Sequence, residues 1–154
     1  MIEFLVNDKP FRIENVVFDL NGTLGEEGRI SPDVRELLSK LSELVKIYII
    51  TSDTFGTAKG LDVPAEVVTL APDRSASAEK KRWIQRLGAD KTVAVGNGYN
   101  DHLMLKEAVL GICVIGREGA CSLSVEMSDI VVTDIRDAIS LLLNARRIVA
   151  TLRD

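Results

Sequence analysis

The sequence predicts an α/β fold in three layers (α/β/α), in which helices cover both faces of a mostly parallel sheet. Short apolar runs of strand length alternate along the chain with segments whose apolar residues recur at helical spacing. Polar or small residues end several of these runs, as at Asp19, Thr51 and Gly96. Strands that alternate with helices usually lie parallel in one sheet between helical layers, so we expect this architecture here.

The expected strands are short runs of mainly β-branched and other apolar residues, as in strands that are buried on both faces. One example is Ile47 to Ile50, where four apolar residues follow one another. The six expected strands are 15–19, 46–50, 66–70, 92–95, 111–115 and 130–132.

The expected helices are marked by their start and stop signals. Ser31 can cap the first helix, with a proline in its first turn. Ser75 or Ser77 can cap a second helix that Gly88 stops, and Asp134 can cap the last one. The helices are expected at about 31–41, 55–61, 75–87, 100–109, 119–127 and 134–143.

The two ends of the chain lie outside this alternation. Segment 1–14 predicts a hairpin, because two strand-like runs flank the turn sequence Asn-Asp-Lys-Pro at 7–10. Segment 144–154 is less apolar and is expected to be a helix end or a tail that frays. We expect residues 1–154 to form a single domain, because this length suffices for one full core.

Composition narrows the class of protein. Apolar residues make up 46% and charged residues 27%, as in soluble globular proteins. The net charge of −4 argues against nucleic acid or an anionic membrane as a partner. No apolar run approaches the roughly 20 residues of a membrane span. Two cysteines are too few for a disulfide framework, and no signal peptide is recognisable, so we expect a cytoplasmic protein.

The most informative stretch is Val-Val-Phe-Asp-Leu-Asn-Gly-Thr at 16–23. Three apolar residues bring Asp19 to the end of a strand, and Asn21-Gly22 turns the chain. Ligands of α/β proteins gather at the carboxyl ends of the strands. A carboxylate there can be a nucleophile toward phosphorus, a metal ligand or both, although it can also simply cap the turn.

Two more signals follow at later strand and helix ends. Thr51-Ser52-Asp53 ends the next strand, and a hydroxyl with free amides can hold a phosphoryl oxygen or cap a helix. Lys80 or Lys81 lies near a helix start, where an ammonium group can neutralise phosphate. Either lysine taken alone is more typical of a helix surface.

The fourth signal is the glycine-rich sequence Gly-Asn-Gly-Tyr-Asn-Asp at 96–101. Small residues let the backbone approach a ligand, and the oxygen atoms of Asn97, Asn100 and Asp101 suit Mg²⁺. A tight turn followed by a helix cap is the competing interpretation. The chain lacks the glycine patterns of dinucleotide-binding and P-loop sites.

The four signals in this order resemble the haloacid dehalogenase (HAD) superfamily, whose fold is Rossmann-like. Within it, they look most like the phosphorylation domain of P-type ATPases, from about residue 15 to 148. Asp19-Leu20-Asn21-Gly22-Thr23 resembles Asp-Lys-Thr-Gly-Thr of that domain, and residues 96–101 resemble its Gly-Asp-Gly-x-Asn-Asp. Thr51-Ser52-Asp53 with Thr57-Ala58 resembles its Thr-Gly-Asp and Thr-Ala.

The resemblance implies a role for each of these positions. Asp19 would become phosphorylated, and Thr51 would bind a phosphoryl oxygen. Lys80 would stabilise the negative charge on Asp19 and on the phosphoryl group that is transferred. Mg²⁺ would be held by the Asp19 side chain, the main-chain carbonyl of Asn21 and position 97, with Asp101 supporting its water shell. Further expected phosphate-binding residues are Gly22, Ser52 and Asn100.

Two positions depart from the family pattern. Asn21 stands where related phosphatases carry a general acid and base, and Asn97 stands where the family has a metal-binding aspartate. We therefore expect a slow Mg²⁺-dependent phosphohydrolase or phosphotransferase. The alternatives are an impaired domain that binds phosphate or a protein, and a regulatory subunit that copies an ATPase domain.

The intervals from Asp19 to Thr51 and from Thr51 to Lys80 leave no room for a large cap domain. An open site suits a phosphorylated protein, or a phosphorylated small molecule if a neighbouring subunit covers it. The second alternative implies a homo-oligomer.

Overall fold

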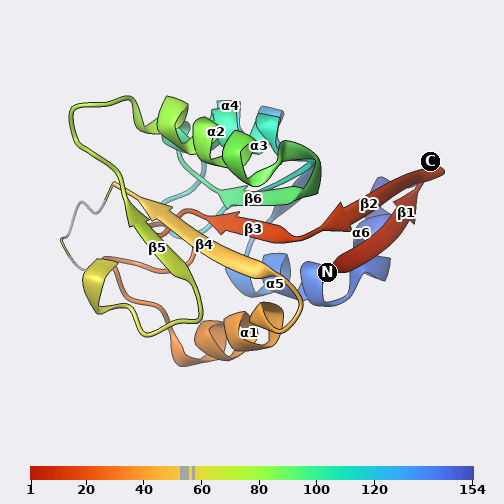
Figure 1. The fold of residues 1–154 in the computed structure, drawn as a ribbon, viewed down its shortest axis with the longest axis horizontal. Helices are drawn as coiled ribbons and strands as arrows, with labels where there is room; N and C mark the ends of the chain where they lie inside the picture. Colours follow the sequence, from red (N-terminus) through yellow and green to blue (C-terminus); the bar gives the residue numbers. More distant parts are fainter. Residues whose placement is uncertain (53–55, 57) are drawn as a thin grey trace.

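The structure, a computed structural model that describes residues 1–52, 56 and 58–154, contains a six-stranded parallel sheet between two layers of helices (Figure 1). The strand order is β5-β4-β3-β6-β7-β8. The strands are β3 (Asn15–Phe18), β4 (Lys46–Thr51), β5 (Glu66–Thr69), β6 (Thr92–Gly96), β7 (Leu110–Val114) and β8 (Ile130–Val132). The expected three-layer fold and each of the six expected strands are confirmed.

Strand β3 lies at the centre of the sheet and pairs with β4 on one side and β6 on the other. All four of its residues are buried. Val16 and Phe18 contribute to one hydrophobic core and Val17 to the other, because successive side chains of a strand point to opposite faces. This central position brings the end of β3 between the ends of its two neighbours.

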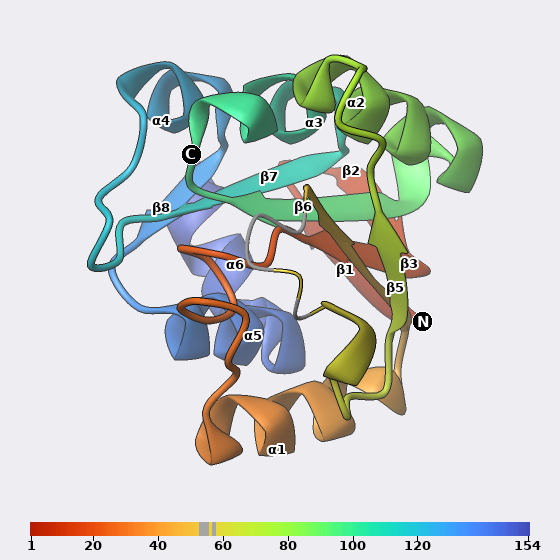
Figure 2. The ribbon, with the colours of Figure 1, turned by 90° about the vertical axis from the view of Figure 1, so that its left-hand side faces the viewer.

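Helices cover both faces of the sheet, as Figure 2 shows. One layer contains α1 (Pro32–Ser42), α5 (Ile135–Leu143) and α6 (Ala145–Leu152). The other contains α2 (Ala76–Leu87), α3 (His102–Glu107) and α4 (Ser122–Met127). The described part of the chain also contains three single 3₁₀ turns: η1 (Ala58–Gly60), η2 (Ala89–Lys91) and η3 (Tyr99–Asp101).

Two of the expected helix caps are confirmed, and those at Ser31 and at Asn100 or Asp101 are not, because Asp101 precedes α3 without a side-chain capping bond. Ser75, rather than Ser77, caps α2 by accepting a hydrogen bond from the backbone N–H of Ala78 at 3.3 Å. Asp134 caps α5 in the same manner. Ser31 occupies the cap position of α1, but its hydroxyl donates to the Asp33 carboxylate instead of accepting from the helix backbone.

The N-terminal hairpin consists of β1 (Ile2–Val6) and β2 (Lys9–Ile13), which pair antiparallel outside the main sheet. Asn7 and Asp8 both have positive φ, as a two-residue hairpin turn of type I′ requires. Of the two alternatives for segment 144–154, a helix end or a fraying tail, the structure shows helix, because residues 145–152 form α6. This helix buries Ile148 and packs against β1 (Figure 1).

Two expected helices are shorter in the structure. The helix expected at 119–127 begins only at Ser122, because residues 115–121 form a loop. The helix expected at 100–109 is divided into the 3₁₀ turn η3 and α3. Of the helix expected at 55–61, the described part contains only the turn η1, and residues 53–55 and 57 lie outside the described residues.

None of the helices in the described part of the chain combines the length and apolar character that a bilayer span needs.

Candidate active site

Asp19 lies directly after β3, at the edge of the sheet where the parallel strands end. Its backbone N–H donates to the Val95 carbonyl oxygen at 3.0 Å, so it continues the pairing between β3 and β6. Its side chain is nearly buried, with 7% of the residue exposed. The sheet thus holds this carboxylate rigidly beside the ends of β4 and β6.

Lys80 brings an ammonium group to Asp19 from helix α2. Its Nζ lies 2.7 Å from Asp19 Oδ1 and 2.7 Å from Asp101 Oδ1, and the residue has no exposed surface. Ile84, one turn later, is also fully buried, so this side of α2 faces the sheet. Lys81 lies instead near the surface, where its Nζ is 3.8 Å from Oε2 of Glu107. Of the two lysines left open by the sequence, the structure therefore brings Lys80 to Asp19.

Burial and charge shift the acid–base behaviour of this cluster. Burial raises the pKa of Asp19 from 3.8 to about 6, and the neighbouring Asp101 carboxylate contributes to the increase against the opposing effect of Lys80. Burial disfavours the ammonium of Lys80, but the charges of Asp19 and Asp101 outweigh it and raise the pKa of Lys80. Two carboxylates share one cation, so the ionised cluster keeps one excess negative charge.

Asp101 orders the glycine-rich loop that follows β6. Its Oδ2 accepts hydrogen bonds from the backbone N–H groups of Asn97 and Gly98, each at 3.0 Å. A Cβ at Gly96 would lie 2.6 Å from Cβ of Asp101, so only glycine lets the acid approach this closely. Asp101 is fully buried and does not line the cleft beside Asp19. These contacts make it a positioning residue for Lys80 and for the loop.

Thr23 links Asp19 to Asn97. Its Oγ1 lies 3.1 Å from Asp19 Oδ2 and 3.1 Å from Asn97 Oδ1. A hydroxyl has one hydrogen to donate, so it cannot satisfy both oxygens at once. One of these two nearly buried oxygens is therefore left with acceptor capacity.

The cleft beside Asp19 has a volume of about 490 Å³. Several side chains expected at a phosphate site line it, among them Thr51, Ser52 and Asn100. Thr51 is buried at the end of β4, and Oδ1 of Asn100 lies 3.4 Å from Lys80 Nζ. Two further residues of the motifs, Asp53 and Thr57, lie outside the described residues.

Asn21 and Gly22 belong to the loop that follows Asp19, and both already make hydrogen bonds within it. Oδ1 of Asn21 accepts from the backbone N–H of Gly28 at 2.6 Å. The N–H of Gly22 donates to the Gly25 carbonyl oxygen at 2.8 Å. A phosphate group at Gly22 would compete with this bond, and the Asn21 side chain is engaged in ordering the loop.

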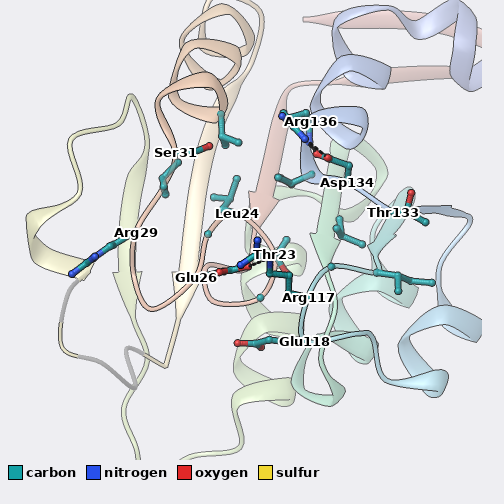
Figure 3. A pocket seen from close by; sticks show the side chains of 18 of the residues that line it. Thr23, Leu24, Glu26, Arg29, Ser31, Arg117, Glu118, Thr133, Asp134 and Arg136 are labelled. Atoms are coloured by element: carbon teal, nitrogen blue, oxygen red, sulfur yellow. Dashed lines mark hydrogen bonds and ion pairs between the residues drawn. The ribbon is translucent and has the colours of Figure 1, made fainter.

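The sequence reasoning missed Glu118, which comes from the loop between β7 and α4 and lines the same cleft as Asp19 and Asn97. It also borders a larger cleft of about 970 Å³, formed with the loop 22–31 and the start of α5 (Figure 3). Glu118 lies outside the four sequence signals, so none of them marked it.

A divalent cation fits the oxygen atoms that converge here. Oδ2 of Asp19 and Oδ1 of Asn97 approach the same hydroxyl of Thr23, and that hydroxyl can satisfy only one of them. A donor set of carboxylate and amide oxygens suits Mg²⁺, which is typically held by one or two carboxylates. Within the described residues, no group of three or more His, Cys, Asp or Glu side chains is arranged to hold a metal ion. The feature that fits a divalent cation here is therefore the pair of oxygen atoms on Asp19 and Asn97.

Sequence comparison finds relatives in an archaeon. No family model matches the chain. The uncharacterised protein MJ0073 of Methanocaldococcus jannaschii is 62% identical over 64 residues, which cover 42% of this chain and 69% of the relative. The uncharacterised protein MJ0072 of the same organism is 44% identical over 39 residues, which cover 25% of this chain and 89% of the relative.

Structure comparison finds hydrolases of the HAD superfamily. The 3-deoxy-D-manno-octulosonate 8-phosphate phosphatase of Moraxella catarrhalis, in complex with magnesium, phosphate and KDO, matches with a TM-score of 0.62 and 20% identity over 90% of both chains. The cobalt-bound enzyme of Haemophilus influenzae matches with a TM-score of 0.65 and 12% identity over 93% of this chain and 94% of its own. The phosphoserine phosphatase of T. onnurineus matches with a TM-score of 0.60 and 19% identity over 87% of this chain and 96% of its own. At these identities, the similarity establishes a shared fold.

Proposed function

We propose that this chain, which belongs to the same family as MJ0073 of Methanocaldococcus jannaschii, is a Mg²⁺-dependent phosphohydrolase or phosphotransferase that acts through a phosphorylated Asp19. The observation that supports this most is the Asp19 carboxylate at the tip of the central strand, held by Lys80 at 2.7 Å and facing a cleft. The fold shared with HAD-superfamily phosphatases is consistent with the proposal.

The proposed reaction has two steps. A carboxylate oxygen of Asp19 forms a bond to phosphorus while the bond from phosphorus to the leaving oxygen breaks. The leaving oxygen keeps the bonding electron pair and takes a proton from water. Water then attacks phosphorus, the bond to Asp19 breaks, and inorganic phosphate leaves with the carboxylate restored. In the phosphotransferase variant, an acceptor hydroxyl replaces this water.

Lys80 and the rim of the cleft neutralise and orient the phosphoryl group. Phosphoryl transfer depends mainly on positioning and charge stabilisation, and a buried ammonium beside the nucleophile contributes to both. We propose that Thr51, Ser52 and Asn100 contact phosphoryl oxygens, because all three line the cleft. Asp101 keeps Lys80 in place, because its Oδ1 accepts a hydrogen bond from Lys80 Nζ at 2.7 Å.

The proposed ligands of Mg²⁺ are the Asp19 carboxylate, the main-chain carbonyl of Asn21 and Oδ1 of Asn97. When bound, the cation supplies positive charge that stabilises the transferring phosphoryl group. The magnesium, phosphate and cobalt in the two octulosonate phosphatase structures belong to those proteins and support this proposal by analogy of fold.

Turnover is expected to be slow. Asn21 cannot move a proton as a carboxylate does, and its side chain is bound to the backbone of Gly28. General acid–base help is typically worth about 10²–10⁴-fold in rate, so its loss favours a long-lived acyl phosphate. This engaged asparagine also favours a second candidate function, a domain that binds phosphate or a protein without turnover.

The substrate class follows from the shape of the site. The cleft beside Asp19 is open, and within the described residues the segments that separate β3, β4 and α2 hold only α1, η1, β5 and their connections. We propose a phosphorylated protein as substrate, or a phosphorylated small molecule that a neighbouring subunit covers. The motif order remains the support for a closer relation to P-type ATPases.

A panel of phosphomonoesters tested with Mg²⁺ for phosphate release checks the proposal. Asp19→Asn, shown by circular dichroism to be folded, is the control and is expected to abolish release. Turnover that survives Asp19→Asn would overturn the mechanism. Absence of turnover by the natural protein, together with saturable phosphate binding, would instead support the second candidate.

A further inference from the structure

We infer that Glu118 is the second acidic side chain of the cation site and that its carboxylate replaces the charge that Asn97 lacks. The inference rests on the proposed function, because it concerns the cation at the same cleft. It adds a residue from a loop that none of the four sequence motifs includes.

The first observation is that Glu118 converges with Asn97 over Gly22. A Cβ at Gly22 would lie 2.5 Å from Oε2 of Glu118 and 2.7 Å from Nδ2 of Asn97. The missing side chain of Gly22 thus leaves a space that the Glu118 carboxylate occupies. Glu118 and Asn97 line the cleft beside Asp19 together, although they come from different loops.

The second observation is that the Glu118 loop is attached directly to Asn97. Nδ2 of Asn97 donates to the Gly119 carbonyl oxygen at 3.3 Å, and the N–H of Cys121 donates to the Asn97 carbonyl oxygen at 2.8 Å. Within the loop, the N–H of Gly119 donates to the carbonyl oxygen of Gly116 at 2.9 Å. These bonds flank Glu118 and fix its backbone beside the site.

The third observation is that the Glu118 carboxylate has no partner within the described residues, in which it makes no hydrogen bond or ion pair. The neighbouring Arg117 lies 3.6 Å from Glu26 instead, and Figure 3 shows this arginine directed toward Glu26. Glu118 is exposed at the cleft, so its charge is available to a cation there.

Charge balance gives this carboxylate its role. The buried cluster of Asp19, Asp101 and Lys80 carries one excess negative charge, and Asn97 contributes none. A divalent cation beside it is better compensated by two negative charges than by one, and ligand charge tunes the affinity of oxygen sites. Glu118 provides the second negative charge at the same cleft.

The test measures Mn²⁺ binding directly, from the electron paramagnetic resonance signal of free Mn²⁺, and Mg²⁺ binding by competition. Glu118→Gln keeps the shape of the side chain and removes its charge. We expect it to lower the affinity for both Mn²⁺ and Mg²⁺ by about tenfold or more, the range typical of residues that support a metal site. Glu27→Gln is the matched control, because Glu27 is exposed and lines only the larger neighbouring cleft.

A double-mutant cycle distinguishes charge replacement from a general effect. Asn97→Asp places a carboxylate at position 97. In this background, Glu118→Gln is expected to lower the affinity for Mn²⁺ by less than about threefold. Two results would overturn the inference. One is that Glu118→Gln lowers the Mn²⁺ affinity no more than Glu27→Gln does. The other is that Glu118→Gln lowers it equally in the natural protein and in the Asn97→Asp variant.

Asp19→Asn separates this inference from the proposed function. Loss of Mn²⁺ binding on Asp19→Asn but not on Glu118→Gln overturns the inference and leaves the function standing. Weaker binding on Glu118→Gln in a protein without phosphatase activity supports the inference and counts against the function. A natural protein that binds neither Mn²⁺ nor Mg²⁺ overturns both.

Discussion

Replacing Asp19 with asparagine is expected to make the fold more stable while it abolishes phosphoryl transfer. The buried carboxylate has its pKa raised from 3.8 to about 6, mainly by burial, so the ionised form is disfavoured in the folded protein. A pKa increase of this size corresponds to about 3 kcal/mol of folding free energy at neutral pH. An asparagine removes that charge and can still accept the hydrogen bond from Lys80, which keeps Asp101 as its counter-ion.

The effect has a defined pH dependence. In the folded protein Asp19 holds its proton up to about pH 6, whereas in the unfolded chain it loses the proton near its ordinary pKa of 3.8. The destabilisation by the ionised carboxylate is therefore absent below the unfolded pKa and complete above the folded one. The stability difference between Asp19→Asn and the natural protein should grow from near zero at pH 4 to its full value above pH 6.

Urea unfolding in the presence of EDTA, followed by the fluorescence of the single tryptophan, Trp83, measures this difference at several pH values. The matched control is Asp33→Asn. Asp33 is a surface carboxylate whose pKa is lowered by Ser31 and Arg136, so its neutralisation should not stabilise the fold. A lower stability of Asp19→Asn at pH 7.5, or a gain that persists unchanged at pH 4, would refute the reasoning.

Three further predictions concern the same site. Lys80→Met should lower the free energy of unfolding by about 3–5 kcal/mol in urea titrations, because it leaves two buried carboxylates without their cation, whereas Lys81→Met should have little effect. Asn97→Asp should tighten Mg²⁺ binding by about tenfold or more in calorimetric titrations and raise the phosphatase rate at low Mg²⁺; unchanged affinity would place the cation elsewhere. Gly96→Ala should cost about 1–3 kcal/mol of stability and reduce activity, because the added methyl group would lie 2.6 Å from Cβ of Asp101; an unaffected variant would show that the loop adjusts freely.

The positions of the strands and most helices followed from local patterns. Buried parallel strands need continuous apolar runs such as 47–50, and the helices need a polar cap and a stop, as at Ser75 and Gly88. Such signals act over a few residues, so a single sequence carries them. They also placed Asp19 and Thr51 at the same edge, because parallel strands end on one side of a sheet.

The interior of the site depended on contacts between distant segments. Two adjacent lysines have similar local surroundings in the sequence, and only the packing of α2 against the sheet decides that Lys80 points to Asp19. In the same way, the engagement of Asn21 with Gly28 reflects the path of an irregular loop. The order at residues 145–152 arises from the contact of α6 with the hairpin.

By itself, the sequence determined a parallel α/β sheet with Asp19 at the end of its central strand β3, because strand length, apolar runs and caps are local properties. The tertiary structure alone decided which lysine meets that acid, what the asparagines contact, and that Glu118 enters the cleft. These outcomes depend on how loops without periodicity are folded over one another, and no local pattern encodes that arrangement.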